Sequence, residues 1–263
     1  MTETPDALLW RHLQTLPAFR ALLRAAEATF YQRVALPRPV LDVGCGDGHF
    51  AAHTFAEPLD VGLDPWWEPL REARVWRGHR LVLAADGAAM PFAAQSFGSA
   101  ISNSVLEHIP HVDAVLAEVH RVLRPRAPFL VTVPNHRFTR NLSGARLLER
   151  IGWTRAADAY RRAFNRISRH VRTDPPEVWQ ARFERAGFRV RARRDYFSPT
   201  ALALLEWGHA YGLPSWLVKR VTGRWMVSPA RWNVAWLHRA LRRFVRQPEH
   251  PQGAYTFFYL ERR

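Results

Sequence analysis

The sequence predicts an α/β protein built on a mostly parallel sheet with helices on both faces. Short apolar runs typical of buried strands alternate with stretches of helical apolar spacing through most of residues 37–134. A glycine-rich loop follows the first predicted strand, and acidic residues follow several of the strands. Alternation of this kind favours parallel pairing, because each crossover helix returns the chain to the same end of the sheet.

Each element of this fold rests on its own pattern. Apolar spacing within residues 5–33 predicts two short helices, separated where Pro17 interrupts the pattern. Short apolar runs predict strands at residues 40–43, 59–63, 81–84, 97–102 and 128–133. Helical spacing predicts the helices between them, at residues 49–55, 66–76 and 112–123.

The alternation lapses beyond Pro134. Residues 136–174 are rich in arginine, and we expect a helical insertion there. A helix and two further strands are then predicted, at residues 176–186, 188–197 and 254–260. Residues 198–250 are too long for a plain loop, so we expect this tryptophan- and arginine-rich segment to form a helical insertion or a lid.

This pattern divides the chain into an N-terminal helical segment of residues 1–36, a main domain of residues 37–197 and 251–263, and the two insertions. The net charge of +15 is unevenly placed. It is −2 over residues 1–135, and the second half of the chain carries the whole basic excess. A basic region of this kind attracts phosphates, nucleic acid or an anionic membrane surface.

The cysteine content and the apolar runs limit the kinds of protein that this sequence can encode. The 263 residues include one cysteine, Cys45, which excludes an internal disulfide and argues against a cysteine-based zinc site. The first residues do not resemble a secretory signal, and no apolar run is long enough for a transmembrane helix. We therefore expect a cytoplasmic protein, with peripheral contact at the inner membrane face as an open alternative.

The glycine loop lies at residues 44–48, between the first strand and the following helix. Glycine allows a tight turn and a close approach to a ligand, but the third glycine of the dinucleotide fingerprint is replaced by His49. Acidic residues lie at or just after the carboxyl ends of predicted strands, at Asp42, Asp47, Asp64 and Asp86. Acidic groups there would repel a pyrophosphate, so they favour a ligand with positive groups and ribose hydroxyls.

Several motifs in order resemble those of one family. The motifs are VLDVGCGDG at residues 40–48, GLD at 62–64, ADGAAMPF at 85–92, FGSAISNSVLEHI at 97–109 and EVHRVLRP at 118–125. They resemble class I S-adenosylmethionine-dependent methyltransferases of the small-molecule, quinone-biosynthesis-like branch (methyltransferase type 11). The resemblance implies a Rossmann-like, mostly parallel seven-stranded sheet and S-adenosylmethionine as the cofactor. One departure is Ser99, where many relatives carry an aspartate.

The resemblance also implies roles for individual residues. The first loop would face the amino-acid part of the cofactor, with Asp42, Gly44, Cys45 and Gly46. The next strand end would hold the ribose hydroxyls through Asp64, with Pro65 beside it. The adenine would lie against Asp86 and Gly87, and the methionine moiety and the transferred methyl group would border Asn103 and Ser104.

His108 is a candidate general base, because it follows the fourth strand near the expected mouth of the site. A packing or capping role ahead of Pro110 is the alternative. His49 and His53 lie one helical turn apart, but no third ligand accompanies them, so we expect a solvated helix face and no metal site.

The methyl acceptor is left open between classes. The one cysteine, Cys45, lies in the cofactor loop, which argues against a methyltransferase that attacks pyrimidines with a cysteine nucleophile. Residues 102–105 also lack the motif typical of base-amine methyltransferases. A small hydrophobic or lipid-linked acceptor is therefore favoured. The alternatives are an RNA or ribosomal-protein methyltransferase that grips phosphates through residues 136–194, and a non-catalytic binding module.

Residues 231–246 predict a basic amphipathic helix. Apolar and aromatic residues step by four along it, at Trp232, Trp236, Ala240 and Phe244, with most arginines expected on the other side. We expect the aromatic face to be hidden from water, either packed on the protein or lying on a membrane surface. The sequence does not define the oligomeric state.

Overall fold

The computed structural model of the protein describes residues 3–211 and 231–263. Two compact units make up the chain. One consists of residues 1–33, 137–168 and 195–254, and the other of residues 34–136, 169–194 and 255–263. The N-terminal segment and most of both predicted insertions therefore gather in a single unit, which the sequence analysis treats as three separate additions.

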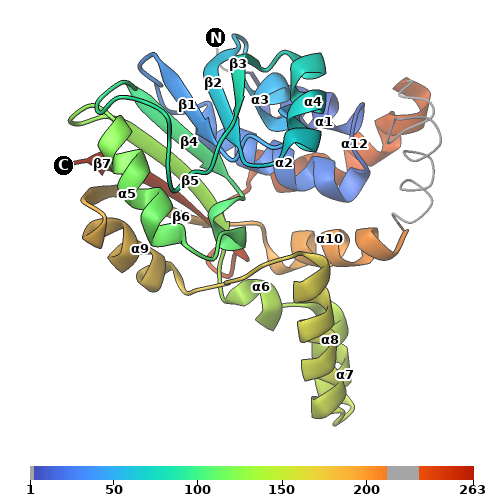
Figure 1. Cartoon of the computed structure of the whole chain (residues 1–263). Coiled ribbons are helices and arrows are strands. Elements are labelled where there is room, and N and C mark those ends of the chain that lie inside the picture. The colour runs from blue at the N-terminus through green and yellow to red at the C-terminus, as the bar shows by residue number, and fades with distance from the viewer. Residues whose placement is uncertain (1–2, 212–230) are drawn as a thin grey trace. The chain divides into compact units, whose positions relative to one another are not determined.

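The second unit is built on the predicted sheet (Figure 1). Its strands are β1 (Val40–Val43), β2 (Leu59–Asp64), β3 (His79–Ala84), β4 (Ser99–Asn103), β5 (Pro128–Pro134), β6 (Phe188–Tyr196) and β7 (Tyr255–Arg262). Their order across the sheet is β3-β2-β1-β4-β5-β7-β6. The five neighbouring strands β3, β2, β1, β4 and β5 pair in parallel, whereas β7 runs antiparallel to β5. The predicted mostly parallel seven-stranded sheet is confirmed, and its strand order reverses between β1 and β4, where open α/β sheets bind ligands.

Helices cover both faces of this sheet. They are α3 (His49–Thr54), α4 (Trp67–Trp76), α5 (Val112–Val122) and α9 (Pro176–Arg185), together with the short 3₁₀ helix η1 (Leu106–His108). The buried side chains of α5 and α9 belong to one apolar cluster with β1, β4, β5 and β7, while α3 and α4 lie on the other side (Figure 1). Burial of the Val115–Val119 stripe explains the helical spacing that predicts α5.

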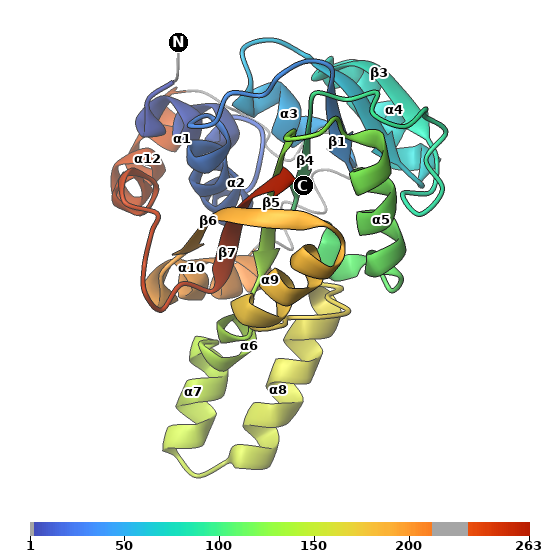
Figure 2. The same cartoon turned by 90° about the vertical axis from the view of Figure 1, so that its left-hand side faces the viewer.

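The first unit is helical. Its helices are α1 (Pro5–Leu13), α2 (Ala18–Tyr31), α6 (Arg137–Arg140), α7 (Ser143–Arg150), α8 (Thr154–Ile167), α10 (Pro199–Tyr211) and α12 (Arg231–Arg246). Helices α1, α2 and α12 pack together, and α7 and α8 form an antiparallel hairpin (Figure 2). Pro17 lies at the N-cap of α2, as the sequence predicts for the break between the first two helices. None of the described helices is long and apolar enough to cross a membrane.

One buried carboxylate joins α10 to the beginning of α7. The side chain of Glu206 is 2% exposed, and its two oxygens accept four hydrogen bonds. Oε2 accepts from the backbone N–H and the hydroxyl of Ser143, at 2.6 and 2.7 Å. Oε1 accepts from the Gly144 N–H at 2.9 Å and from the Tyr160 hydroxyl at 2.7 Å. A carboxylate at this position satisfies N–H groups that the first turn of α7 cannot pair internally.

The packing of α12 corrects one expectation. Its buried side chains are Val234, Leu241 and Val245, whereas Trp232 is 78% exposed and Trp236 is 63% exposed. The expectation that the aromatic face packs on the protein is therefore wrong for Trp232 and Trp236 within the described residues. A step of four residues advances about 40° around a helix of 3.6 residues per turn, so the aromatic series does not remain on one narrow face. Trp216 and Trp225 of the same insertion lie outside the described residues.

Candidate cofactor site

The glycine loop is bound to the end of β2. The backbone N–H groups of Gly44 and Cys45 both donate to the carbonyl oxygen of Leu63, at 2.7 and 3.0 Å. Gly44 has a φ of +76°, and a Cβ there would overlap the side chain of Val105. Glycine is therefore required at this position both for its backbone conformation and for its close approach to the segment after β4.

Asp64 also binds the glycine loop, through its side chain. Its carboxylate, at the end of β2, is 8% exposed. Oδ2 accepts from the Gly46 N–H at 3.0 Å, and Oδ1 accepts from the Trp66 N–H at 2.9 Å, on the far side of Pro65. Burial raises the pKa of Asp64 above its ordinary value, although the two N–H groups oppose this shift. Each carboxylate oxygen has a second lone pair, so Asp64 can still accept hydrogen bonds from a diol.

Asp42 lies in a buried polar contact that the sequence analysis missed. His79 Nε2, at the start of β3, lies 2.9 Å from Asp42 Oδ2, and both side chains are nearly fully buried. The pair reaches across Gly62 of β2, where a Cβ would crowd both the His79 ring and the Cys45 sulfur. No local pattern marks His79, because the apolar run that predicts this strand begins at Leu81. Burial, with a further contribution from Asp42 and Asp64, raises the pKa of the Cys45 thiol, which is therefore not a reactive thiolate.

The other predicted cofactor residues follow β3 and β4. Asp86 is exposed, and its Oδ1 accepts from the Ala88 N–H at 2.9 Å in a tight turn. Gly87 is buried. Asn103 Nδ2 donates to Thr132 Oγ1 at 2.8 Å. The strand pairing places the ends of β1 to β4 at one edge of the sheet, so the structure brings together the residues predicted for the cofactor.

Ser104 has a left-handed backbone, with a φ of +51°. Its N–H donates to the carbonyl oxygen of Thr132 on the neighbouring strand, at 3.0 Å. A non-glycine residue in this region is uncommon, and the hydrogen bond compensates for part of its cost. The bend turns the chain directly into Val105, the residue that packs against Gly44.

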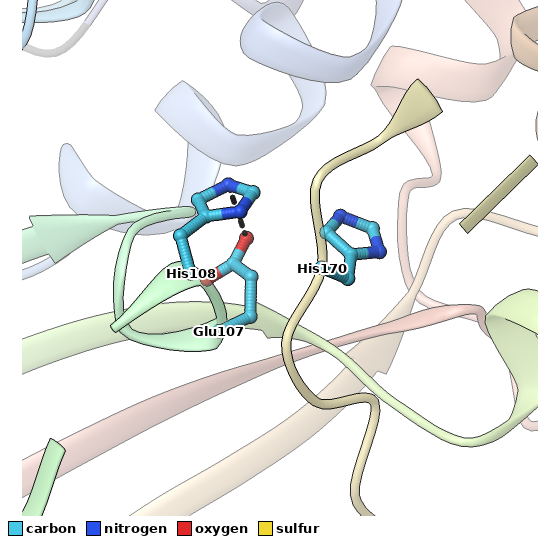
Figure 3. Close-up of side chains that lie close together, drawn as sticks. All are labelled: Glu107, His108 and His170. Carbon is cyan, nitrogen blue, oxygen red and sulfur yellow. Dashed lines mark ion pairs between the residues drawn. The ribbon is translucent and has the colours of Figure 1, made fainter. Parts of the chain in front are cut away.

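His108 follows this bend and lies near Glu107 and His170 (Figure 3). Its Nδ1 lies 2.8 Å from the carbonyl oxygen of Arg169 and must donate, because a carbonyl can only accept. Its Nε2 lies 3.7 Å from Oε1 of Glu107. Burial, with a smaller effect of His108, lowers the pKa of His170 to about 3. The role of His108 as general base depends on Nε2 and stays a prediction. Nothing in the local sequence marks His170, which comes from an irregular segment.

The other histidine pair is a packing feature. The rings of His49 and His53 stack with centroids 4.0 Å apart, and Trp76 packs edge-on against both. His49 is 5% exposed, so the expected solvated helix face is wrong at this position.

Known proteins resemble this part of the chain. Residues 41–131 match the family model described as a methyltransferase domain. A malonyl-[acyl-carrier protein] O-methyltransferase of Legionella pneumophila is 31% identical over 115 residues, which cover 41% of this chain and 40% of that protein. An uncharacterized methyltransferase of Mycobacteroides abscessus is 36% identical over 96 residues, which cover 34% and 36% of the two chains. The matched region thus spans about two fifths of the length of these curated relatives.

Solved structures share the fold over more of the chain. A methyltransferase of Thermotoga maritima, described as a possible histamine N-methyltransferase, superimposes with a TM-score of 0.58 at 14% identity and covers 94% of this chain and 91% of its own. Phosphoethanolamine N-methyltransferase 2 of Haemonchus contortus gives a TM-score of 0.55 at 16% identity, over 91% and 52%. Residues 41–131 thus match a methyltransferase domain by sequence, and the chain shares its fold with S-adenosylmethionine-dependent methyltransferases of known structure.

Proposed function

We propose that this protein transfers a methyl group from S-adenosylmethionine to an oxygen atom of a small hydrophobic or lipid-linked acceptor. The observation that carries the proposal is the glycine loop held by Asp64. This arrangement leaves open space at Gly46, where a Cβ would meet nothing within 4 Å, beside a carboxylate with spare lone pairs. The name of the Legionella relative, an O-methyltransferase, supports oxygen as the methylated atom.

The residues of this edge fit the cofactor by their chemistry. The bound cofactor supplies a methyl group on a positively charged sulfur. Asp64 would accept hydrogen bonds from the ribose hydroxyls, and the loop at Gly44 and Gly46 would lie against the amino-acid part. Asp42 contributes negative charge near a ligand that carries positive groups, while His79 fixes its orientation. Methyl transfer is a direct displacement, so the protein mainly positions the reactants and excludes water.

Substitution of Asp64 is expected to weaken cofactor binding. Asp64→Ala removes a charge-assisted pair of hydrogen bonds and should cost about 1–3 kcal/mol in the binding of S-adenosylhomocysteine, measured by calorimetry. Because burial raises the pKa of Asp64, the wild-type affinity should fall as the pH falls through that raised value, at a higher pH than for an exposed aspartate. Asp64→Asn should bind weakly with no such pH dependence. Equal affinity of wild type and Asp64→Ala would remove the ribose role.

The exposed face of α12 supports a lipid surface as partner. Trp232 and Trp236 share this face with Arg239 and Arg243, which follow Trp232 by seven and eleven residues. The expectation that most arginines lie on the other side of the helix is wrong for these two residues. Tryptophan favours the interfacial region of a bilayer, and arginine is attracted to anionic headgroups. The exposed tryptophans would then be hidden from water when the protein is bound, as their residue type requires. The combination fits an anionic membrane that presents a lipid-linked acceptor.

Flotation with vesicles tests this surface. We expect wild-type protein to float with vesicles of phosphatidylglycerol and phosphatidylcholine, and Trp232→Ala/Trp236→Ala to lose most of this binding. Trp66→Ala/Trp67→Ala is the matched control, because these tryptophans of the other unit are 71% and 56% exposed. Arg239→Gln/Arg243→Gln should weaken binding to the anionic vesicles, as should added salt. Absence of wild-type flotation would contradict the membrane proposal.

The nucleic-acid alternative rests on the arginines of residues 136–194. Exposed apolar side chains interrupt them at the tip of the α7–α8 hairpin, where Leu147, Ile151 and Trp153 are 57%, 55% and 63% exposed. Such side chains gain nothing beside phosphates, so this segment favours the alternative less than its charge alone suggests. Copurified RNA and a steep loss of RNA binding with salt, unchanged by the tryptophan substitutions of α12, would favour it instead.

The acceptor itself can be found by mass. Wild-type protein and isotopically labelled cofactor would be incubated with lipid and aqueous fractions of a cell extract, and each fraction searched for a species that gains one labelled methyl group. Labelling in the lipid fraction supports the proposal. Labelled RNA or ribosomal protein would replace it, and cofactor binding without any labelled product would favour a non-catalytic module.

A further inference from the structure

A cluster of metal-ligating side chains lies beside the turn after β4. Glu107 and His108 come from η1, and His170 comes from the segment that precedes α9 (Figure 3). Within residues 3–211 and 231–263, this is the one group of three such side chains whose ligand atoms all lie within 4.8 Å of one another. Glu107 is 1% exposed. Buried carboxylates in proteins are paired or coordinate metal ions, so the cluster is a candidate for either.

The main chain fixes the position of His170. The N–H groups of Val171 and Arg172, which directly follow it, donate to the carbonyl oxygen of Glu107 at 2.9 and 3.2 Å. The guanidinium group of Arg172 donates to three further carbonyl oxygens of the same turn. Segments distant in sequence are therefore bound together on one side of His170. These main-chain and guanidinium hydrogen bonds hold the cluster together, so it is not a chance meeting of flexible side chains at a surface.

The hydrogen bonding of His108 leaves Nε2 as a ligand atom. Its Nδ1 donates to the carbonyl oxygen of Arg169 on the other side of His170, so a neutral ring carries its lone pair on Nε2. That lone pair lies 3.7 Å from a carboxylate oxygen of Glu107. A cation between this nitrogen and this oxygen could be bound by both. Metal-ligating histidines characteristically donate their other N–H to a carbonyl or carboxylate, as His108 does.

We propose that Glu107, His108 and His170 bind a divalent transition-metal ion, with Zn²⁺ as the best match. Two imidazoles and one carboxylate suit Zn²⁺ and its neighbours, whereas Mg²⁺ prefers oxygen ligands. Ligand atoms around tetrahedral Zn²⁺ lie about 3.3 Å apart, so the cluster closes on the ion by modest side-chain shifts. Three protein ligands leave a position open for water or another oxygen ligand. Bound metal would make Nε2 of His108 a ligand instead of a base.

Metal binding by the whole protein tests this assignment. Metal-free wild-type protein should bind one equivalent of Zn²⁺ and, with Co²⁺, should show the visible absorption typical of low-coordinate cobalt. Mg²⁺ in excess should not displace either ion. His170→Ala and the conservative Glu107→Gln should each weaken Zn²⁺ binding by at least about tenfold, with circular dichroism confirming that both variants fold.

His111→Ala is the matched control, because this exposed histidine lies on the same turn outside the cluster. It should retain wild-type affinity and the cobalt spectrum. His170→Ala also separates the two roles of His108. It keeps the imidazole of His108 as a general base but removes His170 as a ligand of the metal ion. The proposal is overturned if wild-type protein binds Zn²⁺ no more tightly than His170→Ala, or if His111→Ala weakens binding as much as Glu107→Gln does.

Discussion

Glu206→Ala is expected to destabilise the helical unit by about 3–5 kcal/mol, the largest stability effect that we anticipate for a single substitution. The change leaves two backbone N–H groups at the start of α7 and two hydroxyls without their acceptor. Each buried donor left unpaired costs about 1–3 kcal/mol, and a cavity adds to the loss. The midpoint of urea unfolding, followed by far-ultraviolet circular dichroism, measures the effect.

Two variants make this measurement specific. Glu206→Gln keeps one oxygen as acceptor and should fall between wild type and Glu206→Ala. Glu184→Ala removes an exposed glutamate from α9 and should change stability by less than about 0.5 kcal/mol. An unfolding midpoint of Glu206→Ala equal to that of wild type would show that the four hydrogen bonds do not hold α7 to α10.

Gly44→Ala is expected to abolish cofactor binding at concentrations that saturate the wild type. A left-handed alanine costs about 1–2 kcal/mol, and the new Cβ would also overlap Val105. The loop must move to relieve this overlap, and both N–H groups that donate to Leu63 move with it. Calorimetry with S-adenosylhomocysteine measures the loss.

The contribution of the overlap can be separated from that of the backbone. Gly46 also has a positive φ, of +54°, but a Cβ there meets nothing within 4 Å. Gly46→Ala should therefore show mainly the conformational cost and bind more tightly than Gly44→Ala. Val105→Ala should restore part of the affinity in a Gly44→Ala background. Equal affinities of Gly44→Ala and wild type would contradict the assigned close approach.

Local patterns predicted most of the sheet and the helices. Apolar runs and helical spacing are properties of neighbouring residues, so they predict β1 to β5 and α3 to α5 without any tertiary contact. The position of Asp64 after its strand likewise predicted which edge of the sheet it occupies. The charge pattern predicted a basic second half but not its architecture.

The pattern of α12 shows where such reasoning fails. Packing on the protein was one of the two places expected for Trp232 and Trp236, yet Val234, Leu241 and Val245 are the residues buried. All these side chains are apolar, so the sequence offered two faces and gave no reason to choose between them. The choice depended on α1 and α2, which pack on this helix and come from the other end of the chain.

The sequence by itself determined the fold of the sheet, the order of its strands along the chain and the residues at the carboxyl ends of the parallel strands, because each depends on local apolar periodicity or on a contiguous motif. Only the tertiary structure decided the partners of the buried polar groups. Glu206 accepts hydrogen bonds from the start of α7, Asp42 pairs with His79, and Glu107 lies beside His170, each between segments distant in sequence. Hydrogen bonds and ligand sets require positions accurate to fractions of an ångström, and folding alone brings these atoms together.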